Sequence, residues 1–314
     1  MPRRQLRRAL PLLLLGLVTG LGACEPRDAQ PPAHAPNTRA ETTHAGASAR
    51  VHAGAPDVVV PFRVPADSEM PAGEVGAAIR RGRAMLVATR ESLPAFARSG
   101  LQCVSCHPAA GTTPNAMPWV GVYARFPQYR SRSGTVQVIE DRVNDCFLRS
   151  LNGRALPPAS REMRDIVAYF AFLSQGVPVG ARVEGQGLPT LAAAARSSGD
   201  TTRGAALFAA ECARCHGDRG QGSAVAPPLW GARSFNVGAG MARLRTAAAF
   251  IRHNMPRDRP GTLTDAEAVD VAAYVVSRPR PDFAAKAHDW PNGDPPPDVA
   301  YPTTAAPARA AGPR

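Results

Sequence analysis

The sequence predicts an all-α protein with two small domains in tandem, and three observations support this prediction. The pattern Cys-x-x-Cys-His occurs twice, at Cys103–His107 and at Cys212–His216. Apolar residues recur at helical spacing before and after each copy. The run Arg81–Leu86 ahead of the first copy is echoed by Arg203–Phe208 ahead of the second, as expected of an internal duplication.

Each copy of the pattern is the attachment signature of a c-type haem. The four cysteines would hold two porphyrins through thioether bonds: Cys103, Cys106, Cys212 and Cys215. His107 and His216 would bind the irons as proximal ligands. A zinc site or a disulfide pair is the alternative use of such cysteines. The sequence therefore predicts two cytochrome c-type domains, each with one covalently attached haem c.

Residues 1–23 have the pattern of a secretory signal peptide, in which arginines precede an apolar run that is short for a membrane span. The run ends in Leu21–Cys24, which resembles a bacterial lipoprotein cleavage box. Cys24 would then become the lipidated first residue, whereas ordinary cleavage near Ala23 is the alternative. Because haem c is attached after export, we expect a periplasmic protein with possible membrane attachment through lipidated Cys24.

The first half of the mature chain divides into a tether and a domain. Residues 24–66 are rich in Ala, Pro, Thr, Gly and His and lack hydrophobic periodicity, which predicts a disordered tether. An N-terminal cytochrome c domain is expected over 67–180. Its predicted helices begin near Glu74, cover 135–151 and cover 161–174.

The second half repeats this plan in less space. A linker is expected over 181–199 and a C-terminal cytochrome c domain over 200–290. The capping box Thr264–Glu267 begins the last helix, which runs to Ser277. Residues 291–314 are predicted to be an extended or disordered tail.

The formal net charge of +12 comes almost entirely from arginine, because Lys286 is the only lysine. Compositional bias is one explanation of this charge. The arginines are not interleaved with stacking aromatic residues, so nucleic acid is not an expected partner. An anionic small substrate or an acidic redox partner fits the charge better.

The distal iron ligands can be sought downstream of each motif. Met255 lies 39 residues after His216, and the same interval after His107 leads to Cys146. Cys146 is also the cysteine left over once haem and lipid attachment are counted. Other candidates are His253 for the second haem and Met117 or Met163 for the first. A buried structural cysteine is the alternative role of Cys146.

Charged residues surround Cys146 in the predicted helix. At regular helical spacing Arg142, Cys146 and Arg149 share one face, which Ser150 borders, so two guanidinium groups would flank the sulfur. This setting favours the thiolate, which is the form that binds iron. Three more arginines precede the helix: Arg125, Arg130 and Arg132. A solvated basic face is the alternative interpretation.

These residues resemble the dihaem thiosulfate dehydrogenases, also called tetrathionate synthases. The resemblance covers roughly residues 70 to 295 and is close in five strings: Pro118–Tyr123, Arg125–Arg130, Asn144–Phe147, Gly238–Leu244 and Asn254–Pro256. It implies His107 and Cys146 as axial ligands of the active-site haem, and His216 and Met255 as those of the second.

The resemblance also implies a catalytic set, because substrate-site arginines and a serine of the family map to Arg132, Arg142 and Ser150, beside Cys146. Some members are thought to use a lysine next to the distal methionine. Asn254 stands at that position here, which disfavours a lysine-ligated second haem.

The expected function is therefore oxidation of two thiosulfate ions to tetrathionate, with the electrons passed to a soluble or membrane cytochrome. The alternatives are a tetrathionate reductase and a non-catalytic dihaem electron carrier. The carrier predicts methionine at both distal sites and no cluster of arginines.

Overall fold

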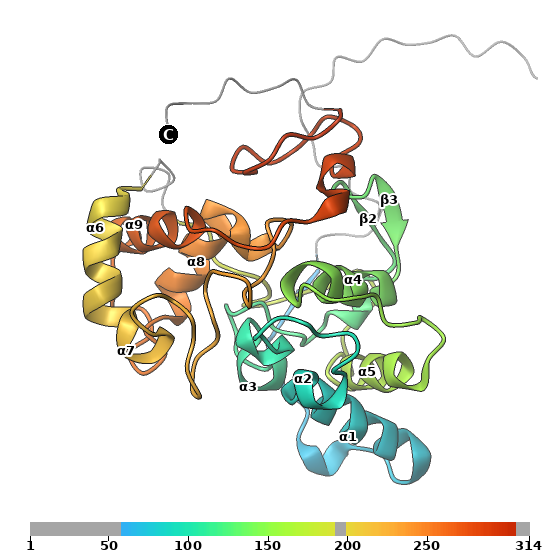
Figure 1. The fold of residues 1–314 in the computed structure, drawn as a ribbon. Helices are drawn as coiled ribbons and strands as arrows, with labels where there is room; N and C mark the ends of the chain where they lie inside the picture. The colour runs from blue at the N-terminus through green and yellow to red at the C-terminus, as the bar shows by residue number, and fades with distance from the viewer. Residues whose placement is uncertain (1–57, 192–198, 306–314) are drawn as a thin grey trace, which may run out of the picture. The chain divides into compact units, whose positions relative to one another are not determined.

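The computed structural model describes residues 58–191 and 199–305 (Figure 1). All of these residues belong to one compact unit of the chain. The expected signal peptide, Cys24 and most of the expected tether lie outside the described residues, as do 192–198 and 306–314.

Helices dominate the described residues, and the strands are short. The α-helices are α1 (Gly73–Val87), α2 (Thr89–Ser92), α3 (Pro108–Gly111), α4 (Ile139–Asp145), α5 (Arg161–Phe172), α6 (Thr201–Leu207), α7 (Ala213–His216), α8 (Leu244–Asn254) and α9 (Asp265–Val276). Strand β1 (Val59–Val60) pairs in parallel with β4 (Arg182–Val183), and β2 (Gln128–Arg130) pairs antiparallel with β3 (Thr135–Gln137). The prediction of an all-α fold is confirmed. Among the described residues, no helix is long and apolar enough to cross a membrane.

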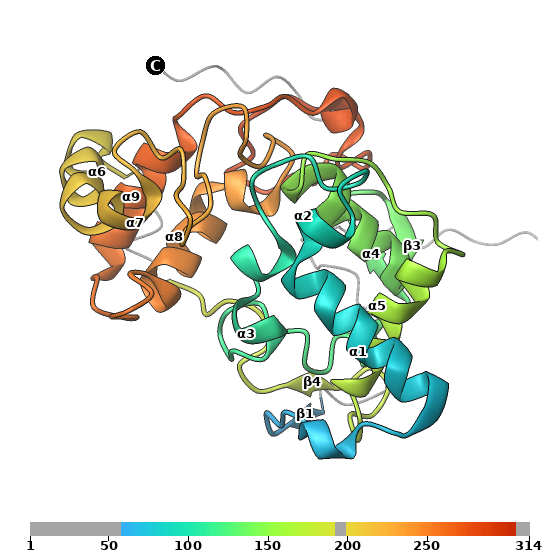
Figure 2. The same cartoon turned by 60° about the horizontal axis from the view of Figure 1, so that its bottom comes forward.

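In the first domain, the first and last helices cross at a glycine. Helices α1 and α5 lie side by side (Figures 1 and 2). Gly82 sits at the crossing, where a Cβ atom would come within 2.0 Å of the carbonyl oxygen of Asp165. The neighbouring Arg81 donates two hydrogen bonds, of 2.7 and 3.0 Å, to the buried carboxylate of Asp165. The Arg-Gly pair therefore permits the close approach and supplies the ion pair that accompanies it.

The second domain repeats this crossing with its own residues. Helix α6 packs on α9, and a Cβ atom at Gly204 would lie 2.0 Å from the carbonyl oxygen of Asp270. Arg203 donates to the Asp270 carboxylate at 2.8 and 3.3 Å. The predicted capping box is present in α9, where Thr264 and Glu267 cap each other. The similarity between Arg81–Leu86 and Arg203–Phe208 is thus explained by packing, because each run places an Arg-Gly pair at a close crossing of two helices.

The helix predicted over 135–151 begins later and ends irregularly. Thr135–Gln137 instead form β3, because Thr135 and Val136 are β-branched and pair with Arg130 and Tyr129 of β2. Helix α4 follows and continues into the π-helical turn η4 (Cys146–Ser150), in which the Leu151 N–H donates to the Cys146 carbonyl at 2.9 Å. The wider π turn rotates residues after Cys146 away from regular helical positions.

Parts of the expected tether and linker are built into the first domain. Val59 and Val60, expected in the tether, pair with Arg182 and Val183, expected in the linker (Figure 2). Alternation in a two-residue strand is too short to be seen as periodicity, so the sequence pattern missed both. The expected tail also makes contacts, since the Tyr301 hydroxyl donates to Asp289 at 2.7 Å.

The glycine at the first crossing gives a test of this packing. We expect Gly82→Ala to lower the free energy of unfolding by about 1 to 3 kcal/mol, because the helices must separate to admit the methyl group. Gly240→Ala is the matched control, since a Cβ atom there would meet nothing within 4 Å. Denaturant unfolding of the haem-loaded protein measures both, and equal stability of the two variants would contradict the proposed packing role.

Candidate active site

The two motif histidines are oriented in the same way. The Nδ1 atom of His107 lies 2.5 Å from the carbonyl oxygen of Met117, and that of His216 lies 2.8 Å from the carbonyl oxygen of Pro227. A backbone carbonyl can only accept, so each Nδ1 carries the proton and each Nε2 keeps a lone pair for a metal. Burial lowers the pKa of His107 to about 4, which keeps its imidazole neutral.

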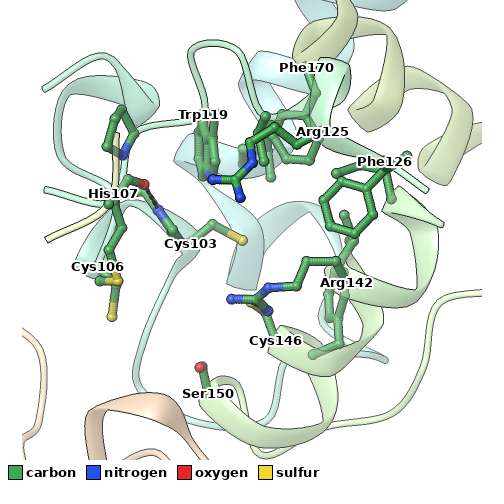
Figure 3. A pocket seen from close by; sticks show the side chains of 18 of the residues that line it. Cys103, Cys106, His107, Trp119, Arg125, Phe126, Arg142, Cys146, Ser150 and Phe170 are labelled. Carbon is green, nitrogen blue, oxygen red and sulfur yellow. Dashed lines mark hydrogen bonds between the residues drawn. The ribbon is translucent and has the colours of Figure 1, made fainter. Parts of the chain in front are cut away.

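The first motif lies on the wall of a cavity of about 1180 Å³, including the part open to solvent. Cys103, Cys106 and His107 line it, together with Cys146 and Ser150 from the turn η4 (Figure 3). Burial raises the pKa of Cys103 and of Cys106 to about 12, so both are neutral thiols. The structure therefore brings the leftover thiol and the predicted serine into the same cavity as the first motif.

Arg142 contacts the sulfur of Cys146 directly. Its Nη1 atom donates to Sγ at 3.0 Å, and Figure 3 shows its guanidinium group lying across Cys146. The charge of Cys146 raises the pKa of Arg142 and outweighs the opposing effect of burial. This pair was predicted by spacing on one helical turn, and the structure places it as expected.

Arg149 does not flank the sulfur, contrary to the regular helix that the sequence suggested. The π turn moves it to the other side of the chain, where it forms two hydrogen bonds with Asp289, of 2.7 and 2.8 Å. Its guanidinium group also lies over the ring of Phe283. The positive charge of Arg149 is therefore neutralised outside the cavity.

Arg132 also lies outside the set of residues that line the cavity. It donates to the carbonyl oxygen of Gly238 at 2.7 Å and lies over the ring of Trp290 at 4.7 Å. Burial, followed by the charge of nearby Arg149, lowers its pKa to about 10. The structure thus brings Cys146, Arg142 and Ser150 together in the cavity lining and leaves Arg132 outside it.

Two arginines that the predicted catalytic set omitted line the cavity instead, Arg125 and Arg130. Burial lowers the pKa of each guanidinium group, and for Arg130 the charge of Arg142 adds to the effect. No described carboxylate lies within 4.0 Å of Arg125, Arg130 or Arg142 to form an ion pair. The string Arg125–Arg130 was the sequence signal that could have identified them.

The second motif sits among aromatic residues. Cys212 packs in a cluster with Phe208, Trp230 and Tyr274, and Phe208 contacts both of the other rings. Met255 directly follows α8, and its loop is tied to the motif by Arg214, which donates to Asp258 at 2.7 Å. The Asn254 side chain donates to the carbonyl of Asn115 in the first domain at 3.2 Å.

The alternative distal ligands occupy other positions. Met163 is fully buried in the packing face of α5. The carbonyl of Met117 is hydrogen-bonded to the ring of His107, the residue that would be the proximal ligand. His253 lies in the last turn of α8, two residues before Met255, so it is still a rival of Met255 for the second iron.

The donor set suits haem c better than a bare metal ion. In the described part of the chain, no three His, Cys, Asp or Glu side chains converge to hold a metal. The first cavity offers two neutral thiols for thioether bonds, one neutral imidazole and a third sulfur beside an arginine. A covalently attached haem would use the two thiols for its thioether bonds and the imidazole and the third sulfur as ligands of its iron.

Comparisons with family models identify both halves. Residues 95–179 match the SoxA/TsdA cytochrome c domain, and residues 199–275 match cytochrome c oxidase, cbb3-type, subunit III. The fold and the two motif sites define a tandem cytochrome c protein, and such domains carry haem c.

Curated relatives narrow this class. A thiosulfate dehydrogenase from Allochromatium vinosum is 48% identical over 76% of this chain and 91% of the relative, and one from Psychrobacter arcticus is 42% identical over 76% and 74%. The chain belongs to the thiosulfate dehydrogenase family. A solved thiosulfate dehydrogenase (TsdBA) from Marichromatium purpuratum has a TM-score of 0.67 and 34% identity over 70% of this chain, which spans 50% of that one.

The buried ion pair between Arg149 and Asp289 should contribute to the free energy of unfolding, and this can be tested by mutation. Asp289 and Arg149 are both largely buried, so Asp289→Ala leaves a guanidinium group in the interior without its main partner. We expect the free energy of unfolding to fall by about 3 kcal/mol. The control is Asp282→Ala, whose partner is Lys286 at the surface, and it should change stability little. Comparable losses in the two variants would contradict the buried role of Asp289.

Proposed function

We propose that the protein oxidises two thiosulfate ions to one tetrathionate ion in the first cavity and delivers the two electrons to a cytochrome acceptor. The observation that carries this proposal is the contact between Arg142 and the sulfur of Cys146, in a cavity that is also lined by Arg125 and Arg130, which form no ion pair with a carboxylate of the described residues. The membership in the thiosulfate dehydrogenase family supports it.

The charge of the cavity matches the main physical obstacle of this reaction. Two thiosulfate dianions must approach until their sulfur atoms bond. At 4 Å and an effective dielectric constant near 20, two unit charges repel by about 4 kcal/mol, so two dianions repel by about 16 kcal/mol. Fixed guanidinium groups that are already buried offset such repulsion without reorganising during the reaction. A plain electron carrier has no need of these groups.

Each residue of the predicted catalytic set has a proposed part. Arg142 stabilises an anionic sulfur on Cys146 and attracts substrate to it, and Ser150 offers a hydroxyl on the same wall. Arg132, whose guanidinium group contacts Gly238 and Trp290, contributes its charge from outside the cavity lining rather than by a contact. The arginines thus bind the oxyanion groups while the sulfur chemistry takes place beside Cys146.

We further propose one covalent haem c in each domain. The four motif cysteines would attach the two haems, with His107 and Cys146 on the first iron and His216 and Met255 on the second. When bound, haem supplies an acceptor that takes one electron at a time. A methionine ligand raises the reduction potential relative to a thiolate, which suits the second domain for passing electrons onward.

Export to the periplasm and lipid attachment at Cys24 are also proposed, on the basis of the leader sequence. We expect the wild-type protein to sediment with membranes and Cys24→Ala to be released into the soluble periplasmic fraction. Fractionation with detection of the haem protein checks this, and identical distribution of the two would contradict lipidation.

The reaction is tested directly by anaerobic assay with thiosulfate and an artificial electron acceptor. We expect haem reduction by thiosulfate and one tetrathionate for every two electrons accepted, because two thiosulfate ions each lose one. Tetrathionate is quantified by chromatography and electrons by acceptor absorbance. Haem reduction without tetrathionate would leave only an electron carrier.

The role of Cys146 is tested by Cys146→Met. The variant should keep both haems, because its motif cysteines are intact, and should lose turnover by a factor on the order of 10³ or more, as expected when a central reactive group is removed. Met163→Leu serves as the control, since it removes a rival thioether from the core with little change in volume. Near-normal turnover of Cys146→Met would overturn the assignment.

A further inference from the structure

We propose that Gln186, from the segment between the two cytochrome c domains, positions Arg125 as a second oxyanion-binding group of the first cavity. The ligand class is a small, dianionic sulfur oxyanion. The inference rests on the proposed function and deepens it, because it assigns a residue outside the matched domain of 95–179 to the substrate site. Gln186 is a positioning residue, and Arg125 is the group that contacts the anion.

The segment that carries Gln186 is fixed on both sides by the backbone. The Asn115 N–H donates to the Gly185 carbonyl at 2.7 Å, and the Met117 N–H donates to the Gly187 carbonyl at 2.9 Å. Met117 is the residue whose carbonyl orients His107. Gln186 therefore stands between two anchors on the loop that also fixes the proximal histidine.

A glycine makes room for this segment. A Cβ atom at Gly121 would lie 2.3 Å from the Val183 side chain and 3.7 Å from the Gln186 amide nitrogen. Gly121 also has a positive φ of 74°, which side-chain-bearing residues rarely adopt. The close approach brings Val183 and Gln186 against the cavity wall.

Only the oxygen of the Gln186 side-chain amide has hydrogen-bond partners among the described residues. Its Oε1 accepts from Arg125 Nη1 at 3.3 Å and from the Val183 N–H at 3.4 Å. Its Nε2 is buried without a hydrogen-bond partner, and Gln186 lines the cavity. An unsatisfied buried donor is costly, so the two contacts of Oε1 must hold the amide in this orientation against that cost.

Arg125 is held without being neutralised. Elsewhere in the described chain, Arg81, Arg149 and Arg203 are oriented by aspartates, which cancel their charge. An amide oxygen orients the guanidinium group and leaves its charge intact. Arg130 has the same arrangement, because its Nη1 lies 3.5 Å from Oε1 of Gln128. Glutamines therefore replace carboxylates next to the two arginines that line the cavity beside Arg142.

The contact that Arg142 makes with Cys146 creates the need for a second anion-binding arginine in the cavity. Arg142 already donates to the sulfur of Cys146, so part of its donor capacity is committed. Figure 3 shows the guanidinium groups of Arg125 and Arg142 reaching into the cavity from different walls, with Cys103 labelled between them. Arg125, oriented by the amide oxygen of Gln186, can hold an oxyanion group away from Cys146, as a second substrate ion or the far end of the product demands.

The test measures thiosulfate binding and turnover separately. Binding is followed by calorimetry on the haem-loaded protein held fully reduced, which cannot accept electrons from thiosulfate, and turnover by KM and kcat. We expect Arg125→Gln to raise the thiosulfate Kd about tenfold or more and Gln186→Ala about three- to tenfold, with larger effects on KM than on kcat. Gln186→Glu keeps the shape of the side chain but neutralises Arg125, so it should match Arg125→Gln.

A double variant separates positioning from direct binding. If Gln186 acts through Arg125, then Arg125→Gln with Gln186→Ala should bind thiosulfate no more weakly than Arg125→Gln alone. Matched controls are Gln175→Ala and Arg80→Gln, both exposed and away from the cavity, which should leave Kd and KM unchanged.

Three results would overturn the inference. The first is an unchanged thiosulfate Kd in Gln186→Glu, and the second is full additivity in the double variant. The third is an Arg125→Gln variant whose first haem has a shifted midpoint potential while the thiosulfate Kd is unchanged, which would assign Arg125 to the carboxylates of the cofactor. Failure of the proposed function would give a result that can be distinguished from these three. A wild-type protein that binds thiosulfate through Arg125 and Gln186 but does not oxidise it would retain the subsite and lose the reaction.

Discussion

The hydrogen bond from Arg142 to the sulfur of Cys146 lies in a cavity that is also lined by Arg125 and Arg130, and neither of these arginines forms an ion pair with a carboxylate in the described parts of the chain. Like charges buried together repel and pay a desolvation cost, so the cavity is unfavourable by itself and must be held open by its surroundings. The π turn at Cys146, the fixed loop that includes Met117 and the strand pair β2–β3 supply that support. An anion that enters the cavity relieves the repulsion, which makes the same strain a source of binding energy.

The second domain takes part in this support. The Asn236 side chain, almost fully buried, donates to the carbonyl of Leu148 at 2.8 Å, and the Asn236 N–H donates to the carbonyl of Arg149 at 3.1 Å. Both acceptors lie in the turn that begins with Cys146. Gly238 accepts from Arg132 as well. The geometry of the proposed active site in the first domain therefore depends on a loop that precedes α8 of the second, and the tandem arrangement has a structural purpose beyond placing two haems near each other.

Features set by local spacing could be predicted from the sequence, and features set by the path of the chain could not. The motif sites, the crossing helices, the capping box at Thr264 and the pairing of Arg142 with Cys146 all follow from residues a few positions apart or from internal duplication. The π turn that begins at Cys146 inserts an extra residue into the helix, so Arg149, which regular spacing placed beside the sulfur, was misplaced, whereas Ser150 still lines the cavity. Gln186 was assigned to a linker because two-residue strands carry no readable periodicity, and its contact with Arg125 spans 61 positions of the chain.

The abundance of arginine and the near absence of lysine can be understood from what the guanidinium group does here. Arg132 binds a carbonyl and covers an indole ring at once, Arg149 binds a carboxylate through two nitrogens and covers a phenyl ring, and Arg280 combines the Val275 carbonyl with the ring of Phe235. A planar fork with a delocalised charge can make both contacts in one pose, whereas an ammonium group cannot. The arginines therefore divide into two groups by their partners. Those bound to carboxylates, carbonyls and rings stabilise the fold, whereas Arg125 and Arg130, which lie beside amides, keep their charge for a ligand.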